Sequence, residues 1–476
     1  MLSLGGDLAG NRVNPRSFIR RVVTPTLTAL ALAAGAGAVA PQAAGAADYV
    51  PGVVLVGYAS THTASFAADV ANSHAVRESA AASTPDGRVV RVPRGLTVAQ
   101  EIARLRRQRG VVYAVPDYRA HLAGAWIPND RGRTNVARGW QRTQWNFLPS
   151  TGVNAPQAWA NLFAVKRGGG KGVIVAVLDT GVAYRNWHQF RKSPDFAWTH
   201  FASPYDFVAG NRYPLDREGH GTFVTGLIAE STNNSLGLTG LAYGATIMPV
   251  RVLDSSGFGD ANKISKGIRY AATHGAQVIN LSLEFDPTVT AGDIPDIVSA
   301  IRFAHDRGAV VVGASGNEGE SEIAYPARDS DAISVGATTL DRCLADYSNG
   351  CAKLDLVAPG GGNDASLPND PPCHPGRHLP DVYQMTFANS NRPGQFSFPG
   401  GWYGTSMAAP EVSAAAAMVI ASGVIGRRPT PAQILTRLES TAQSLGGAKP
   451  NDNYGYGLLD IGAATSRAGT AGAPAP

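Results

Sequence analysis

Three polar residues occupy positions where an apolar run of the sequence meets glycine. Asp179 ends the run 173–178, His220 lies between two glycines, and Ser406 opens a stretch rich in alanine. Taken singly, each residue is most often a cap or a turn residue. The three together are hard to explain as caps, and their types are those that nucleophilic catalysis needs. A serine hydroxyl is too weakly acidic to attack an amide unless a base removes its proton during the attack.

The elements that must position these residues follow from the pattern of apolar runs. Short, β-branched runs without polar alternation predict strands buried on both faces. They are 173–178, 247–253, 277–281, 309–314, 333–337 and 354–357. Stretches with helical spacing lie between them at 260–274 and 293–307, and another helix opens at Thr430. This order predicts an α/β fold with a parallel, doubly wound sheet, covered by helices on both faces, with reactive groups at the carboxyl ends of the strands.

The strings around Asp179, His220 and Ser406 resemble the three signature motifs of the subtilisin-like (S8 family) serine peptidases, in the same chain order. The resemblance covers about 145–464. It implies that Ser406 is the nucleophile, that His220 is the general base and later the acid, and that Asp179 orients the imidazole and stabilises its cation. It further implies a serine endopeptidase that hydrolyses polypeptides through an acyl-enzyme, without a catalytic cofactor.

Further substrate-facing positions come from the same resemblance. Gly316 and Asn317 follow the run 309–314 and resemble the family's oxyanion-hole segment, which makes the Asn317 side chain a donor to the oxyanion, beside the backbone N–H of Ser406. Read alone, Asn317 would be a turn residue between glycines. The segment 279–283 resembles the family's edge strand, which pairs with the substrate backbone. The implied substrate-binding residues are Ser282, Leu283, Glu284, Gly316 and Ala324.

The sequence departs from the family pattern at the cleft. Glu284 stands where the family usually has Gly, and Ala324 stands where a Gly often lies at the base of the primary pocket. With Glu318, Glu320 and Glu322 nearby, one hypothesis is a shallow, acidic pocket that tolerates basic or polar side chains. The alternative is a solvated acidic rim without effect on selectivity.

A further departure is Glu411, where the family commonly has His. It lies more than a turn beyond Ser406, so we expect it to be tolerated without loss of activity.

The loop 232–238 resembles the family's strong calcium site, which uses an Asn side chain and successive loop carbonyls. Oxygen ligands of this kind suit a hard cation. The implied ligands are Asn234, Leu236 and Leu238, with Asp195 as the best candidate for a carboxylate. We expect a structural calcium ion here or no ion at all.

Residues 1–47 have the composition of a secretory signal peptide. Four arginines precede an apolar, alanine-rich run at 22–40, and small residues at 44–46 predict cleavage near Ala46. A disordered or anchored N-terminus is the alternative. Later runs are too short or too interrupted to cross a bilayer. We therefore expect a secreted protein, extracellular or periplasmic, with no membrane attachment after export.

Residues 48–122 read as a small α/β module with strands at 53–56, 89–92 and 111–115 and a helix at 97–109. The segment 111–118 resembles the closing strand of the I9-type propeptide, which assists folding and then inhibits its own enzyme. We expect an exposed linker at 123–144, with the maturation cut between about His121 and Asn129. The peptidase domain is then 145–465, and a Pro/Ala/Gly-rich tail at 466–476 is expected to be disordered.

Charge and cysteine content narrow the function classes. The formal net charge is +5, and residues 1–47 and 48–124 each carry a net +3, which leaves about −1 for the rest. The bulk of the chain therefore has no basic footprint for nucleic acid.

Of three cysteines, Cys343 and Cys351 are the preferred disulfide pair because they close a short loop, although the odd thiol leaves other pairings open.

Two other functions fit the sequence less well than a peptidase does. A nucleotide-binding function for the glycine-rich run 168–172 is disfavoured, because phosphate-binding loops follow a strand and this run precedes one. A catalytically silent, secreted binding protein on a peptidase scaffold is disfavoured because Asp179, His220, Ser406 and Asn317 are all intact. We expect the peptidase to be a monomer.

Overall fold

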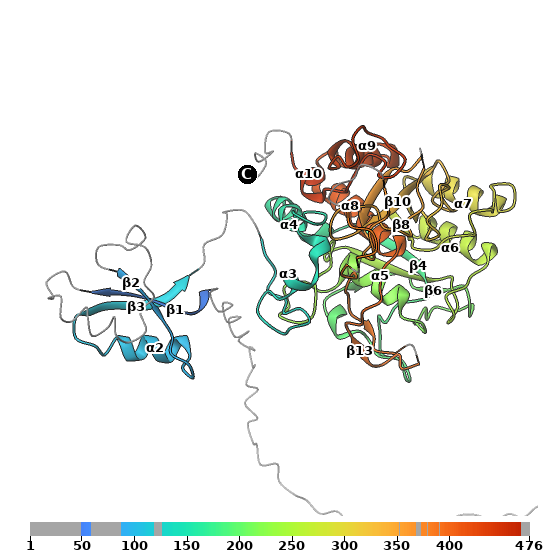
Figure 1. The fold of residues 1–476 in the computed structure, drawn as a ribbon. Helices are drawn as coiled ribbons and strands as arrows, with labels where there is room; N and C mark the ends of the chain where they lie inside the picture. Colours follow the sequence, from blue (N-terminus) through green and yellow to red (C-terminus); the bar gives the residue numbers. More distant parts are fainter. Residues whose placement is uncertain are drawn as a thin grey trace, which may run out of the picture. The chain divides into compact units, whose positions relative to one another are not determined.

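The computed structural model describes residues 49–58, 87–118, 126–351, 353–367, 373–377, 379–389 and 391–467. The predicted signal peptide, part of the expected cleavage region and the tail from residue 468 lie outside the described residues. The chain divides near residue 119 into two compact units, each described here by itself (Figure 1). Within the described residues, no helix is both long and apolar enough to cross a membrane.

The N-terminal unit is a three-stranded antiparallel sheet with one helix. Strand β1 (Tyr49–Tyr58) lies between β2 (Gly87–Arg91) and β3 (Val111–Tyr118), and α2 (Val98–Leu105) packs against it. Thr97 caps α2, since its hydroxyl accepts from the Gln100 backbone N–H at 3.2 Å while the Gln100 side chain accepts from the Thr97 backbone N–H at 2.8 Å. The predicted α/β module is confirmed.

The C-terminal unit is built on a parallel sheet. Its described strands pair in the order β11-β10-β9-β8-β4-β7-β5, with β6 also on β7. Their bounds are β4 (Ile174–Asp179), β5 (His200–Phe201), β6 (Tyr205–Asp206), β7 (Thr246–Arg251), β8 (Val278–Leu281), β9 (Val310–Ala314), β10 (Ala332–Thr338) and β11 (Leu356–Pro359). The pairings between them are parallel. The predicted parallel, doubly wound sheet is confirmed.

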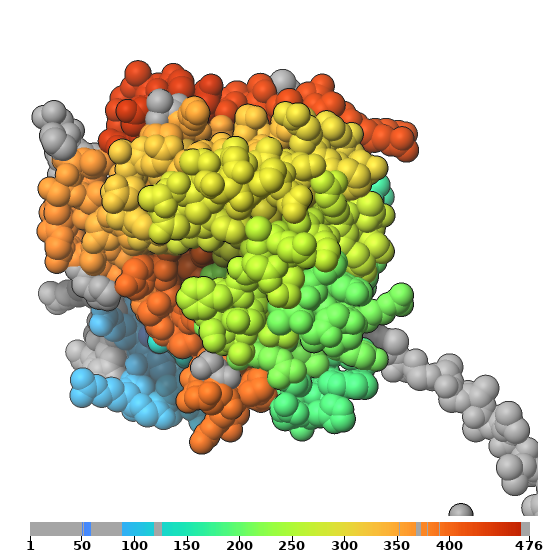
Figure 2. Space-filling view, turned by 90° about the vertical axis from the view of Figure 1, so that its right-hand side faces the viewer, coloured from blue at the N-terminus to red at the C-terminus, as the bar shows by residue number. Residues whose placement is uncertain are grey.

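Helices cover both faces of this sheet (Figure 1). Alternate residues of β4 point to opposite faces: Val175 and Val177 belong to the larger core with α4, α5 and α8, whereas Ala176 and Leu178 belong to the smaller core with α6 and α7. Figure 2 shows the α6 and α7 region, coloured from yellow-green to yellow, as one continuous surface. The helices are α4 (Ala155–Ala164), α5 (His220–Ala229), α6 (Ala261–Thr273), α7 (Pro295–His305), α8 (Thr405–Ser422), α9 (Pro431–Thr441) and α10 (Ile461–Thr465).

Short elements complete the unit. They are α3 (Trp140–Thr143), β12 (Thr386–Phe387), β13 (Phe396–Ser397) and three 3-10 turns at Trp145–Phe147, Gly168–Gly170 and Pro194–Phe196.

The expectation of an exposed linker at 123–144 is wrong for both ends of the part that the structure describes, although residues 133–137 between them are exposed. The Trp126 ring lies 5.8 Å from that of Trp159 and 5.3 Å from that of Tyr243. Trp140 and Asp130 are completely buried. The polar turn residues suggested solvent, but the apolar surface of the tryptophans holds the segment in the folded unit.

The preferred disulfide is also wrong. Cys343 pairs with Cys373, with 5.7 Å between their Cα atoms, and Cys351 is a free thiol. Asp364 explains the pairing, because its carboxylate accepts from the Thr339 hydroxyl at 2.5 Å and from the His374 backbone N–H at 2.7 Å. These contacts hold Cys373, which precedes His374, close to Cys343, although the two cysteines are 30 residues apart in the sequence.

The sheet reverses its direction of growth at β4, which has β7 on one side and β8 on the other. In open parallel sheets the carboxyl ends of the strands beside such a reversal form the usual site of ligand binding and chemistry. The last residue of β4 is Asp179.

Candidate active site

Asp179 and His220 meet at this reversal point. Asp179 is completely buried, and its Oδ1 accepts from the Thr180 backbone N–H at 2.7 Å. His220 is the first residue of α5, and its Nδ1 lies 2.8 Å from Oδ1 and 3.0 Å from Oδ2 of Asp179. A carboxylate at this distance makes Nδ1 the protonated nitrogen, so Nε2 is left to accept a proton.

The glycines around His220 have a steric reason. A Cβ on Gly221 would lie 2.2 Å from the carbonyl oxygen of Gly181 and 3.0 Å from the Cβ of Asp179. Gly219 has a φ of 117°, which residues with a side chain rarely adopt. The glycine pair therefore lets α5 start against the end of β4, which places the imidazole on the carboxylate.

The electrostatics of His220 favour its cation. Burial lowers the pKa of His220, but the charge and hydrogen bond of Asp179, with smaller contributions from Glu218 and Asp216, raise the pKa to about 9. The side chain remains 21% exposed. In its neutral form, an imidazole with a raised pKa is a stronger base than a free imidazole, and this side chain remains reachable from solvent.

Ser406 lies in the first turn of α8, whose backbone N–H groups have no partner four residues back within the helix. Its Oγ donates to the carbonyl oxygen of Ser282 at 3.3 Å, and the Ser282 hydroxyl donates to the carbonyl oxygen of Ser406 at 2.9 Å. The segment after β8 therefore holds the serine from one side.

Asn317 holds the start of α8 from the other side. Its Oδ1 accepts from the backbone N–H and the hydroxyl of Thr405, at 2.8 and 3.0 Å. Because a backbone N–H can only donate, these bonds fix the side-chain oxygen toward α8 and turn the NH2 group the other way. There Nδ2 donates to Oε1 of Glu284 at 3.1 Å. Gly316 is required beside it, since a Cβ there would lie 2.1 Å from the Asn349 side chain.

The expected edge strand at 279–283 is wrong as a description of β8. That strand pairs with β4 on one side and β9 on the other, so it has no free edge. Ser282, Leu283 and Glu284 follow β8 outside the sheet. Ala324 is completely buried, and its N–H donates to the carbonyl of Ser315 at 2.8 Å.

Comparisons with known proteins agree with this geometry. The family model of the subtilase family matches residues 170–457. The chain belongs to the subtilase family. Subtilisin Savinase from Lederbergia lenta is 37% identical over 300 residues, which span 62% of this chain and 91% of that protein. The thermophilic serine proteinase of Bacillus sp. (strain AK1) is 31% identical over 411 residues, 86% of each chain.

A solved structure gives the same picture. The protease of Pseudoalteromonas arctica PAMC 21717 aligns with a TM-score of 0.57 and 28% identity, over 71% of this chain and 99% of that one. The chain is thus a subtilisin-like serine endopeptidase. A second family model, the fervidolysin N-terminal prodomain, matches residues 35–117, so a prodomain precedes the subtilase domain as expected.

The acidic residues around the cleft differ in environment. Glu322 pairs with Arg328 at 3.2 Å. Oε2 of Glu318 accepts from the Asn349 side chain at 2.7 Å and from the Asn317 backbone N–H at 3.0 Å. Burial, with the charge of Glu318, raises the pKa of Glu284 to about 7. Glu284 is therefore partly buried and hydrogen-bonded to Asn317. A freely solvated residue at the rim would have neither property.

The structure brings the expected metal residues together. Oδ1 of Asp195 accepts from Nδ2 of Asn234 at 2.8 Å, and Oδ2 accepts from the Leu238 backbone N–H at 3.0 Å. Leu236 donates its N–H to Oδ1 of Asn234 at 2.7 Å. Burial raises the pKa of Asp195 to about 8, so its ionised form lacks a sufficient positive partner among the described residues.

Two more acids at this loop, Asp130 and Glu230, were not predicted from the sequence. Asp130 accepts from the backbone N–H groups of Asn233 and Asn234 at 2.7 and 3.0 Å, and burial raises its pKa to about 6. Glu230 is completely buried, and within the described residues neither carboxylate oxygen has a hydrogen-bond partner. Burial, then Asp195 and Asp130, raise the pKa of Glu230 well above its usual range. Buried carboxyl groups that lack a cation suit a hard divalent ion, although Asp130, Asp195 and Glu230 do not form a group whose ligand atoms all lie within 4.8 Å of one another.

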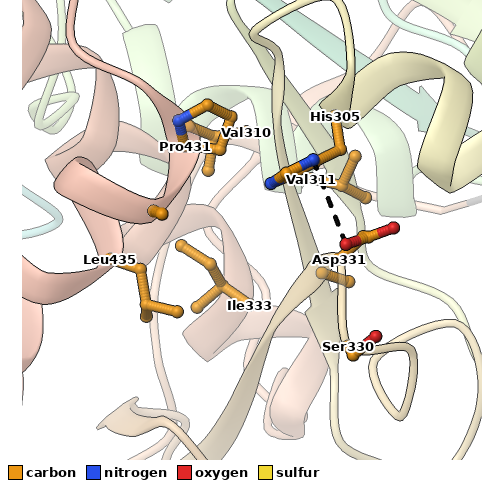
Figure 3. A pocket seen from close by; sticks show the side chains of 10 residues that line it. His305, Val310, Val311, Ser330, Asp331, Ile333, Pro431 and Leu435 are labelled. Carbon is orange, nitrogen blue, oxygen red and sulfur yellow. Dashed lines mark ion pairs between the residues drawn. The ribbon is translucent and has the colours of Figure 1, made fainter.

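A separate pocket lies at the opposite end of the sheet. Its walls include Val310, Ile333 and Leu435, and His305 lies 3.9 Å from Asp331 at its edge (Figure 3). These residues stand at the amino ends of β9 and β10 and on α9. The pocket is therefore distinct from the site at Asp179.

Proposed function

We propose that Asp179, His220 and Ser406 form the catalytic triad of this subtilase. The observation that carries the assignment is the contact of 2.8 Å between Nδ1 of His220 and the buried carboxylate of Asp179. The position of Ser406 at the N-terminus of α8, beside Asn317, supports it. The sequence resemblance names all three side chains. The geometry joins His220 to Asp179, while the Ser406 hydroxyl donates to the Ser282 carbonyl at 3.3 Å, so the assignment of Ser406 rests on the resemblance and on its place in α8.

The residues suggest how a peptide bond is cleaved. The Ser406 hydroxyl turns from the Ser282 carbonyl toward Nε2 of His220, which takes its proton as Oγ bonds to the substrate carbonyl carbon. The resulting imidazolium is stabilised by Asp179. It then gives the proton to the leaving amine as the C–N bond breaks, which leaves an acyl group on Ser406. Water, deprotonated by His220, repeats the sequence and releases the acid.

The oxyanion needs donors during both attacks. Asn317 Nδ2 and the backbone N–H of Ser406 supply them in this proposal, and the Thr405 contacts hold the Asn317 amide in the required orientation. Catalysis by this arrangement needs no reorganisation of the amide oxygen during the reaction.

A fluorophosphonate probe tests the proposal, because it phosphonylates only an activated serine. We expect labelling of the wild type and none of Ser406→Ala. Ser422→Ala, which removes a serine from the far end of the same helix, is the matched control and retains the label. Ser406→Ala and His220→Ala are expected to lower kcat by about 10⁶-fold, a size known for subtilisin itself and carried over from that relative. An unlabelled wild type would instead favour the silent binding protein.

We also propose that the protein is exported as a zymogen, with residues 1–47 as its signal and residues 48–122 as a propeptide that assists folding and blocks the cleft. The prodomain match supports this role. The packing of Trp126 and Asp130 in the subtilase unit favours a cut on the N-terminal side of Trp126, within the expected range from His121 to Asn129.

A structural calcium ion is the last part of the proposal. Asp195, Asn234 and the carbonyls of Leu236 and Leu238 would hold it, and Asp130 is a further carboxylate at the same loop. The ion would supply the positive charge that these buried acids lack, and so stabilise the folded loop.

A further inference from the structure

The carboxyl group of Glu284 engages the amide that the proposed mechanism assigns to the oxyanion. Resting on that proposed function, we propose that Glu284 is a specificity-determining residue, which holds the Asn317 amide until a cationic side chain of the substrate draws the carboxylate away. The side chain in question belongs to the residue whose carbonyl is attacked. Arginine is the substrate residue that fits this role best.

The contact is well defined on both sides. Oε1 of Glu284 accepts from Nδ2 of Asn317 at 3.1 Å, and Thr405 fixes the other end of that amide. Oε2 of Glu284 is buried and has no hydrogen-bond partner among the described residues. The carboxyl group therefore has one oxygen on the oxyanion donor and one buried oxygen without a donor, close to the Glu318 carboxyl group.

The surroundings of Glu284 supply negative charge and no compensating cation. Among the described residues, none of the ion pairs includes Glu284 or Glu318. The cation on this side, Arg328, is occupied by Glu322 at 3.2 Å and by the Pro287 carbonyl at 2.8 Å. Burial, together with Glu318, raises the pKa of Glu284 to about 7, as expected for a carboxyl group that lacks a positive partner.

The substrate can bring that partner. Its reacting carbonyl oxygen must lie on Nδ2 of Asn317, and the carbonyl carbon is bonded directly to the Cα of the residue in question. The side chain on this Cα therefore starts close to the Glu284 carboxylate, because the substrate carbonyl and Oε1 of Glu284 both accept from the same Nδ2. A guanidinium group can bind both carboxylate oxygens at once, which an ammonium group cannot. A neutral substrate side chain cannot bind the Glu284 carboxylate in this way. The carboxylate then continues to accept from Nδ2 of Asn317 and competes with the oxyanion for this donor.

The test uses two fluorogenic peptides that differ only in having arginine or citrulline before the scissile bond. Citrulline keeps the length and shape of arginine and removes its charge. We expect the wild type to prefer arginine at least about tenfold in kcat/KM, because hydrogen bonds to charged groups are worth at least that factor. In Glu284→Gln we expect the ratio to fall to within about threefold, with faster cleavage of the citrulline peptide.

Glu320→Gln is the matched control, because it removes a carboxylate whose side chain is exposed in the same loop region. We expect it to keep the wild-type ratio. Fluorophosphonate labelling gives the concentration of folded, active enzyme for each variant, and Glu284→Gly provides a second variant that removes the carboxylate.

The following outcomes would contradict the inference or the proposed function. A labelled wild type that cleaves both peptides equally, or Glu284 variants that keep the preference, overturns this inference alone. An equal loss in Glu320→Gln also overturns it, because selection would then come from the general field of the rim. A wild type that neither takes the label nor cleaves either peptide overturns the proposed function, and this inference with it.

Discussion

At the scale of single residues, Glu411 is a carboxyl group inside the main core. It is completely buried in α8, and its Oε1 accepts from Nδ2 of Asn146 at 2.6 Å. Neither its Oε2 nor Oδ1 of Asn146 has a partner among the described residues. Burial raises the pKa of Glu411 well above 4.5, although the Asn146 bond opposes the shift. Burial therefore favours the protonated form of Glu411 in the folded protein.

This protonation has a consequence for stability. Because the pKa of Glu411 is higher in the folded chain than in the unfolded chain, the contribution of this group is fully present below pH 4.5 and is lost as the pH rises toward the raised pKa. Glu411→Gln keeps the size and shape of the side chain but removes its titratable carboxyl group. We expect this variant to gain about 1.4 kcal/mol over the wild type per pH unit above that range.

Thermal unfolding at pH 5 and pH 8 measures the effect, in a Ser406→Ala background that prevents self-digestion. Glu320→Gln, at an exposed position, is the control and should show no such trend. A difference between Glu411→Gln and the wild type that is the same at both pH values would contradict a neutral Glu411.

At the scale of elements, the loop between α5 and β7 is held in place by side chains from other segments of the chain. Asn233 and Ser235 have φ values of 65° and 62°, and the carboxylates of Asp130 and Asp195 bind the backbone of the loop. An ion bound only to this folded arrangement would stabilise it by about 2.7 kcal/mol at a free concentration one hundred times its Kd.

Removal of calcium is therefore expected to lower the thermal midpoint by several degrees, since 1 kcal/mol corresponds to about 2–4 °C in a domain of 150–250 residues and somewhat less in a larger one. The measurement compares Ser406→Ala protein in excess calcium and in EDTA, with magnesium as the control ion. Asp195→Asn should reduce the difference. Identical midpoints with calcium and with chelator would remove calcium from the account.

Much of the element level could be predicted from the sequence. The run 173–178 predicts a buried strand because it lacks polar alternation, and the structure has β4 at Ile174–Asp179. Thr97 and Thr430 both precede the helices they cap, since a capping box depends on residues only three apart. Glycines at 219 and 221 also signal the tight start of α5 in the sequence.

What could not be predicted depends on contacts between distant segments. Asp130 binds the loop about 100 residues later, so its local pattern showed only a turn. Cys373 is far from Cys343 in the sequence, and the hydrogen bond from the His374 backbone N–H to Asp364 helps to place it beside Cys343. The departure at Glu284 was visible, but its bond to Asn317 was not, because that bond needs the relative positions of the segments after β8 and β9.

At the scale of the whole molecule, maturation follows from how the two units differ. The subtilase unit has a parallel sheet whose neighbouring strands β4 and β8 are about 100 residues apart, and such non-local pairing slows folding. A prodomain that binds the native state lowers that difficulty by mass action.

If the subtilase unit cuts its own prodomain away, the cut requires Ser406. We therefore expect wild-type protein to begin between about His121 and Trp126 after export, and Ser406→Ala to retain the prodomain. N-terminal sequencing of both forms measures this, and brief exposure of Ser406→Ala to active enzyme shows that its cleavage site is still accessible. A wild type that begins at Asp48 would contradict maturation. A Ser406→Ala protein that is cut normally in a protease-deficient host would contradict self-processing, because no other nucleophile in the proposed site could open that bond.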